Sequence, residues 1–251
     1  MHADYKPAED LLDDRVILVT GAGDGIGRAA AKAFAYHGAT VILLGKTVAK
    51  LEAVYDEIEA AGGPEPAIYP MHLEGATPHE YDEMAHVIDI NFGQLDGILH
   101  NAANLPYLSR IKDYDAEDWI KVMQVNVNAQ FLLTRHMLPL LQAAPAASIV
   151  FTSSGVGRKG RAYWGAYAVA KAGIENLSQT LVDELEDRSP SNRDARRRRG
   201  HQRRCPQTAF EVRTQRGDWR VCSGHRLSPG RSPSLHLDRQ SQLRRNDAPN
   251  C

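Results

Sequence analysis

Three side chains of types that can carry out acid–base chemistry lie close together in the sequence: Ser154, Tyr167 and Lys171. If the segment that begins at Gly165 is helical, Tyr167 and Lys171 are four residues apart and lie on one face, one turn from each other. A cation beside a phenol favours the phenolate and lowers the phenol pKa from its usual value of about 10. A tyrosine tuned in this way is a usable proton donor and acceptor.

Ser154 is the third candidate residue of this group. It follows an apolar run, Ser148 to Phe151, that has the character of a buried strand. Its hydroxyl is therefore expected at the carboxyl end of a strand, where open α/β sheets bind their ligands. A Tyr-x-x-x-Lys pair also arises by chance on ordinary amphipathic helices. Whether this pair indicates a reactive site depends on whether the rest of the chain supplies a ligand-binding site beside it.

A glycine-rich turn near the start of the chain supplies such a site. Residues 15–20 (RVILVT) form a β-branched run typical of a strand, and residues 21–27 (GAGDGIG) lead into an alanine-rich helical segment. In this setting Gly21 allows a tight turn, Gly25 allows close approach to a pyrophosphate, and Gly27 allows the helix to pack on the strand. The helix N-terminus would face the negative charge. The alternative is a simple strand-to-helix turn, which this context disfavours.

The end of the second strand bears on which dinucleotide would bind. Residues 40–44 (TVILL) are followed by Gly45 and Lys46. An acidic residue at this point would accept the ribose hydroxyls of NAD, whereas a cation suits the additional phosphate of NADP. The sequence therefore favours NADP, with NAD as the alternative. Lys46 could equally be a solvated surface lysine, and Asp24 in the glycine loop adds no second cation.

Strand and helix patterns alternate five times along the chain. The expected strands cover residues 15–20, 40–44, 67–73, 96–100 and 148–151, and the expected helices cover 28–36, 48–61, 79–92, 115–141 and 165–186. This alternation predicts an α/β fold, a Rossmann-type doubly wound parallel sheet with right-handed crossovers. No metal-ligand cluster is apparent in the sequence.

The composition divides the chain into two parts. The chain has 251 residues, 43% of them apolar, and a net charge of −1. Residues 189–251 nevertheless hold fifteen Arg, no Lys, only five acidic residues and all three cysteines. We therefore expect a dinucleotide-binding catalytic domain at residues 1–188 and an Arg-rich, disordered tail at residues 189–251. There is no apolar leader and no apolar run of membrane-spanning length, so a cytoplasmic location without membrane contact is expected.

Taken together, the motifs over residues 12–186 resemble the short-chain dehydrogenases/reductases, which are NAD(P)-dependent oxidoreductases built on one Rossmann domain. Thr20 and the glycine loop resemble the cofactor loop of the family, Asn101-Ala102 resembles the start of its Asn-Ala-Gly motif, and Asn126 matches its helical asparagine. Longer stretches, such as LVTGAGDGIGR and VMQVNVNA, are similar to YciK-type bacterial oxidoreductases. The catalytic residues implied by this resemblance are Asn126, Ser154, Tyr167 and Lys171. The implied cofactor-binding residues are Gly21, Asp24, Gly25, Ile26, Gly27, Lys46, Leu73, Asn101, Ala102, Tyr167 and Lys171.

The resemblance also implies a mechanism. Tyr167 would exchange a proton with the oxygen of a small-molecule carbonyl or alcohol substrate, Ser154 would orient that oxygen, and Lys171 would lower the tyrosine pKa and bind the nicotinamide ribose. Asn126 would hold a water that passes protons toward Lys171, although an asparagine there could instead bond helix backbone. The resemblance also implies that the chain self-associates as a homodimer or homotetramer.

The sequence departs from the family at Ala103, which replaces the motif glycine, at His72, which replaces an acidic residue, and above all after residue 188. A sixth strand, a Pro-Gly loop, a substrate-binding helical segment and a seventh strand are expected there, and the sequence carries none of their signals. The fold is therefore expected to be truncated after the fifth strand–helix unit, which could impair activity. Arginine without lysine suggests out-of-frame translation of a GC-rich gene. The alternative for these residues is an evolved basic tail that binds nucleic acid or an acidic partner electrostatically. The chain would then be a non-catalytic dinucleotide-binding protein with a nucleic-acid-binding tail, an interpretation that we favour less, so nucleic acid is not an expected partner.

Overall fold

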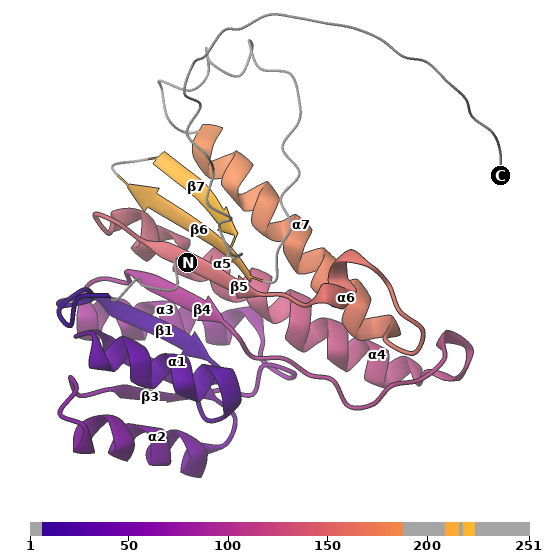
Figure 1. The fold of residues 1–251 in the computed structure, drawn as a ribbon, viewed down its shortest axis with the longest axis horizontal. Coiled ribbons are helices and arrows are strands. Elements are labelled where there is room, and N and C mark those ends of the chain that lie inside the picture. The colour runs from indigo at the N-terminus through magenta and orange to yellow at the C-terminus, as the bar shows by residue number, and fades with distance from the viewer. Residues whose placement is uncertain (1–6, 188–208, 216–217, 224–251) are drawn as a thin grey trace, which may run out of the picture.

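A twisted sheet with helices on both faces forms the body of the molecule (Figure 1). The structure is a computed structural model that describes residues 7–187, 209–215 and 218–223. Five parallel strands run in the order β3-β2-β1-β4-β5. Their bounds are β1 Val16–Thr20, β2 Thr40–Gly45, β3 Ala67–Pro70, β4 Gly97–His100 and β5 Ser148–Thr152. This arrangement confirms the predicted doubly wound parallel sheet.

Burial along the strands follows from their place in the sheet. Every residue of β1 and β4 is buried, as expected for central strands that are covered on both faces. In β5 burial alternates: Ile149 and Phe151 are buried, whereas Val150 between them is only half-buried. The face of β5 that carries Val150 is therefore the less covered of the two.

The helices form two layers, each closing one apolar core. Helices α1 (Gly25–Tyr36) and α2 (Val48–Ala60) pack on one face, where Ala31, Val54 and their neighbours meet the sheet. Helices α3 (Pro78–Phe92), α5 (Ala129–Ala143) and α7 (Gly165–Asp187) pack on the other face. No helix among the described residues is long and apolar enough to cross a bilayer.

The helix predicted over residues 115–141 is continuous but irregular. It consists of α4 (Ala116–Met123), a π-helical turn, η2 (Gln124–Asn128), and α5. Sequence periodicity did not predict the π turn, which places Asn126 in the interior. Two short elements were also missed, the 3-10 turn η1 (Ile111–Asp113) and helix α6 (Gly155–Arg158).

The parallel part of the sheet ends at β5, as predicted for a fold of five strand–helix units, but two antiparallel strands that the sequence analysis did not predict extend the sheet beyond β5. Strand β6 (Ala209–Gln215) pairs antiparallel with β5, and β7 (Asp218–Ser223) pairs antiparallel with β6 (Figure 1). A strand at a sheet edge presents unpaired backbone groups that favour such pairing. The alternation of apolar and polar residues over 210–213 (FEVR) is the period-two signal that the arginine content obscured. The remainder of residues 189–251 lies outside the described residues, as does the predicted boundary at residue 188.

Candidate active site

The predicted site residues lie where three neighbouring strands end. Strand β1 pairs in parallel with β4, and β4 with β5, so their carboxyl ends lie along one edge of the sheet. The glycine loop follows β1, Asn101 follows β4, and Ser154 follows β5. This edge is where ligands bind in open α/β sheets.

The glycine loop has a backbone that only glycine allows. Gly21 has a φ of +66°, and a Cβ placed on it would lie 3.0 Å from Cα of Ala102. A Cβ on Gly27 would collide with the carbonyl oxygen of Gly21. Gly25 has a φ of +51° and faces open space. The loop therefore forms a cradle with free space above Gly25, in front of the N-terminus of α1, which fits the pyrophosphate of a dinucleotide.

Thr20 joins the glycine loop to the segment after β4. Its Oγ1 accepts hydrogen bonds from the backbone N–H groups of Asn101 (2.9 Å) and Ala102 (3.0 Å). This buried hydroxyl fixes two predicted cofactor-binding residues relative to the loop. Its role could be inferred from sequence only as part of the family motif.

The charged groups around the loop include a cation that sequence analysis missed. Asp24 caps α1 by accepting from the backbone N–H of Gly25 (2.7 Å), and Nζ of Lys50 donates to the same carboxylate (2.6 Å). The hydrogen bond from Lys50 is the main reason that the pKa of Asp24 is lowered. Lys50 lies in the first turn of α2, so a second cation in addition to Lys46 reaches the glycine loop, where it is paired with Asp24.

The other predicted cofactor contacts differ in exposure. Lys46 lies exposed directly after β2, and Ile26 is exposed in the first turn of α1. Leu73, which follows β3, is 9% exposed and belongs to the apolar core on the face covered by α3, α5 and α7. Lys46 and Ile26 are accessible to a ligand, whereas most of the Leu73 side chain is not.

Helix α7 brings Tyr167 and Lys171 together as their spacing predicts. Nζ of Lys171 lies 5.5 Å from the centroid of the Tyr167 ring. The same ammonium donates to the backbone carbonyl of Thr152 (2.6 Å), at the end of β5. Ser154, two residues further on, is half-buried just before α6. The three predicted catalytic residues therefore lie around one junction between β5, α6 and α7.

The electrostatics of this group differ from the sequence-based expectation. Burial lowers the pKa of Lys171 to about 8, and burial raises the pKa of Tyr167. The expected lowering of the tyrosine pKa by Lys171 is not observed in this structure. The ammonium lies over the ring face and bonds the Thr152 carbonyl, so its charge is not directed at the phenol oxygen.

Asn126 acts on a loop and not on its own helix. Its Oδ1 accepts from the backbone N–H of Asn104, and its Nδ2 donates to the carbonyl of Asn104, both at 2.7 Å. The side chain is fully buried, and the π turn lets it reach the segment after β4. Neither hydrogen bond is to helix backbone, and the proposed water-holding role stays a prediction.

Two segments lie side by side next to this group. The backbone N–H of Ser109 donates to the carbonyl of Tyr163 (3.0 Å), and Ser109 forms a β-bridge with Trp164. Tyr163 has a φ of +75°, an uncommon conformation for a residue with a side chain. The Trp164 ring lies 6.0 Å from that of Tyr167. These segments bring exposed apolar side chains, including those of Leu108 and Tyr163, next to the segment that carries Tyr167.

A glycine-lined nucleotide cradle beside a Ser, Tyr and Lys group, at one edge of a doubly wound sheet, defines a nucleotide-dependent oxidoreductase. The short-chain dehydrogenase family model matches residues 15–189. The chain belongs to this family, whose members carry out NAD(P)-dependent oxidoreduction.

Individual relatives agree with this assignment. The chain is 48% identical over 184 residues to the uncharacterized oxidoreductase YciK of Escherichia coli K12, a match that covers 73% of each protein. It is 33% identical over 182 residues to an NADPH-dependent pterin aldehyde reductase of Arabidopsis thaliana, covering 71% of this chain and 72% of that protein. A short chain dehydrogenase from Escherichia coli CFT073, solved in complex with NADPH, has 49% identity and a TM-score of 0.71, covering 72% of this chain and 76% of that one. The predicted resemblance to YciK-type oxidoreductases is confirmed.

Proposed function

We propose that this chain is an NADP-dependent carbonyl reductase or alcohol dehydrogenase whose reacting groups are Tyr167, Ser154 and Lys171. The observation that carries the proposal is the placement of the Lys171 ammonium over the face of the Tyr167 ring, next to the strand end that is followed by Ser154. These groups share one sheet edge with a glycine cradle that fits a dinucleotide. The substrate is a small molecule with a carbonyl or an alcohol group.

Each residue has a distinct task in this proposal. The Tyr167 hydroxyl donates its proton to the carbonyl oxygen during reduction and takes a proton back during oxidation. The Ser154 hydroxyl donates a hydrogen bond to that oxygen and orients it. The Lys171 ammonium supplies positive charge beneath the tyrosine ring, and Asn126 holds the segment after β4 against the site.

The cofactor-binding residues are proposed from the same edge. The glycine loop and the N-terminus of α1 bind the pyrophosphate, and Asn101 and Ala102 lie against the loop. The bound nicotinamide supplies or accepts the hydride. Lys46 is exposed at the end of β2, and we propose that it binds the phosphate that distinguishes NADP from NAD. The NADPH complex of the Escherichia coli CFT073 relative supports this preference.

Replacing Tyr167 with Phe tests the reaction. We expect wild-type protein to oxidise NADPH in the presence of an aromatic aldehyde such as 4-nitrobenzaldehyde, chosen because apolar side chains flank the site. Tyr167→Phe should lower kcat by about 10² to 10⁴, the usual contribution of a general acid. NADPH affinity, measured by fluorescence titration, should stay within about twofold. Tyr36→Phe on the exposed face of α1 is the matched control, and turnover retained in Tyr167→Phe would refute the assignment.

Replacing Lys46 with Ala tests the cofactor preference. A charge-assisted hydrogen bond to phosphate contributes about 1.5–3 kcal/mol, so the Kd for NADPH should rise at least about tenfold. The Kd for NADH should not change, because NADH lacks that phosphate. Lys112→Ala, which removes an exposed lysine of the 3-10 turn η1 that is paired with Asp113, is the control. Equal weakening of both cofactors would place Lys46 elsewhere in the site.

Self-association is part of the proposal. Exposed apolar side chains lie on α4, α5 and α7, namely Ile120, Phe131 and Val169. Such side chains on neighbouring helices suit a homodimer or homotetramer interface. Light scattering during size-exclusion chromatography measures the assembly directly.

A further inference from the structure

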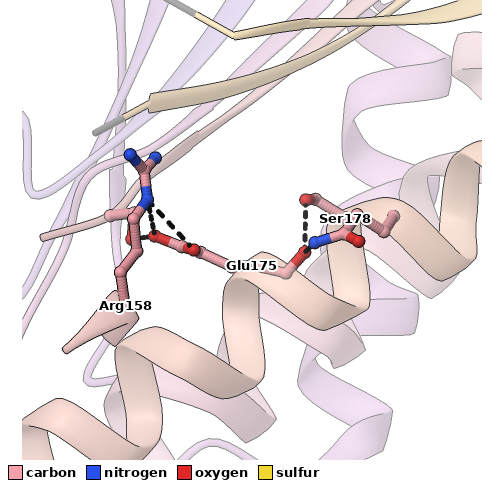
Figure 2. Close-up of polar contacts among 5 residues, drawn as sticks. Arg158, Glu175 and Ser178 are labelled. Carbon is pink, nitrogen blue, oxygen red and sulfur yellow. Dashed lines mark hydrogen bonds and ion pairs between the residues drawn. The ribbon is translucent and has the colours of Figure 1, made fainter. Parts of the chain in front are cut away.

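A mostly buried carboxylate lies one helical turn beyond Lys171 on α7. Glu175 is 9% exposed, and Oγ of Ser153 donates to its Oε1 at 2.6 Å. Arg158 Nε donates to the same carboxylate, at 3.3 Å to Oε1 and 3.4 Å to Oε2. Figure 2 shows Arg158 reaching the Glu175 side chain from one side of the helix.

Both partners of Glu175 flank Ser154. Ser153 is the residue before it, and Arg158 ends the short helix α6, which begins directly after Ser154. The Glu175 carboxylate therefore binds the turn that carries Ser154 at two points, Ser153 before it and Arg158 after it. Because Lys171 bonds the Thr152 carbonyl, α7 holds three positions in and around this turn: Thr152, Ser153 and Arg158.

Close packing makes this attachment direct. A Cβ on Gly157 would lie 2.9 Å from the backbone carbon and from Cβ of Lys171, so α6 rests against the α7 backbone at that residue. The Gly157 N–H in turn donates to the carbonyl of Ser154 (2.9 Å), which fixes the backbone of the turn. A shift of α6 would therefore move Ser154 and Lys171 relative to each other.

Charge explains why a carboxylate suits this place. A buried anion is costly unless it is paired with a cation and hydrogen-bonded. Arg158 supplies the paired cation, and Ser153 supplies a hydrogen bond. The Glu175 carbonyl also accepts from Oγ of Ser178 (2.9 Å) and from Nε2 of Gln179 (3.0 Å) (Figure 2). These bonds fix the helical turn from which the carboxylate projects.

We propose that Glu175 is a positioning residue that, through Ser153 and Arg158, sets where the Ser154 hydroxyl stands relative to Tyr167. The inference rests on the proposed role of Ser154 in the reaction. It assigns to Glu175, Ser153 and Arg158 a task that none of the catalytic motif residues performs.

The first test is a double-mutant cycle on kcat in the full chain, with NADPH and 4-nitrobenzaldehyde. Glu175→Ala and Ser153→Ala should each lower kcat about tenfold or more, because small misplacements of reacting groups are costly. Glu175→Gln should recover part of the loss, since its amide oxygen can still accept from Ser153. In a Ser154→Ala background, neither change should lower kcat further. Losses that add fully in that background would overturn the proposal.

The second test does not depend on turnover, so it separates this inference from the proposed function. Hydrogen exchange at the Gly157 amide reports its bond to the Ser154 carbonyl. We expect at least tenfold faster exchange in Glu175→Ala and Ser153→Ala, and wild-type exchange in Glu184→Gln, which changes an exposed acid on the same helix. Unchanged protection in both variants would disprove the positioning role, even if the wild type were active. An inactive wild type with the expected loss of protection would refute the proposed function alone.

Discussion

Lys171 shows how the site places an ionisable side chain in a costly environment. It is 1% exposed, and its ammonium donates a hydrogen bond to the Thr152 carbonyl. Burial disfavours the ammonium form and lowers its pKa to about 8. Retaining such a group reduces stability at neutral pH, which is common where side chains serve a reaction.

The lowered pKa of Lys171 predicts a specific pH dependence of stability. The folded chain releases the proton near pH 8 and the unfolded chain near 10.5, so the folded form binds fewer protons between these values. The free energy of unfolding should therefore rise as the pH increases from about 8 to about 10.5, by about 3 kcal/mol.

Lys171→Met should lack this rise, because it has no proton to release. Urea unfolding of both proteins at pH 7.5, 9 and 10 measures the difference and cancels the titration of other groups. Lys159→Met, which changes an exposed lysine of the same segment, is the control. Parallel pH curves for wild type and Lys171→Met would contradict the burial-lowered pKa.

The residues that the sequence predicted are those whose relations are local. Tyr167 and Lys171 meet because helix geometry fixes positions four apart, and the glycine loop follows its strand directly. Thr20 with Asn101 and Glu175 with Ser153 are pairings across 81 and 22 residues, made by packing of separate elements. Such pairs carry no periodic signal, so sequence reasoning could not identify them.

At the scale of elements, the site depends on how strand ends are joined. Strands β1 and β4 are neighbours in the sheet, and Thr20 closes the gap between the loop after β1 and the segment after β4. The π turn does the same between the α4–α5 helix and that segment, through Asn126. The doubly wound parallel sheet could be predicted from the alternation of elements, whereas the π turn could not, because its residues have ordinary helical character.

Thr20→Val tests the link between the strands. Valine has nearly the same shape but no acceptor, so the N–H groups of Asn101 and Ala102 would lose their partner. We expect a loss of about 2 kcal/mol in the free energy of unfolding and weaker NADPH binding. Urea unfolding and fluorescence titration measure the two effects. Thr47→Val is the control, since the Thr47 side chain makes no capping hydrogen bond, and equal effects of both changes would argue against the link.

At the scale of the molecule, the two faces of the sheet are not equivalent. Helices α3, α5 and α7 cover one face along β1, β4 and β5, whereas on the other face the described helices are α1 and α2. Val150 on that second face is only half-buried. The antiparallel pair β6 and β7 closes the edge of β5, yet the described residues provide no third helix over this part of the sheet.

The composition after residue 188 suggests why the described residues provide no third helix over β5. The family model matches up to residue 189, and the arginine-rich sequence without lysine begins there. An out-of-frame translation predicts that one single-base insertion or deletion near codons 186–191 restores a chain that continues with the family's sixth strand and Pro-Gly loop.

Resequencing the coding DNA and expressing the restored frame test this prediction. The restored protein should melt at a higher temperature than the present chain, because a completed second helix layer would bury the half-exposed face of β5. Its NADPH affinity should also rise, since the restored loop would cover the cofactor. If no single-base change restores such a segment, the basic sequence is a genuine part of the chain. The site at the ends of β1, β4 and β5 would then have to function with only β6 and β7 beyond β5, without the family's Pro-Gly loop and substrate-binding helical segment.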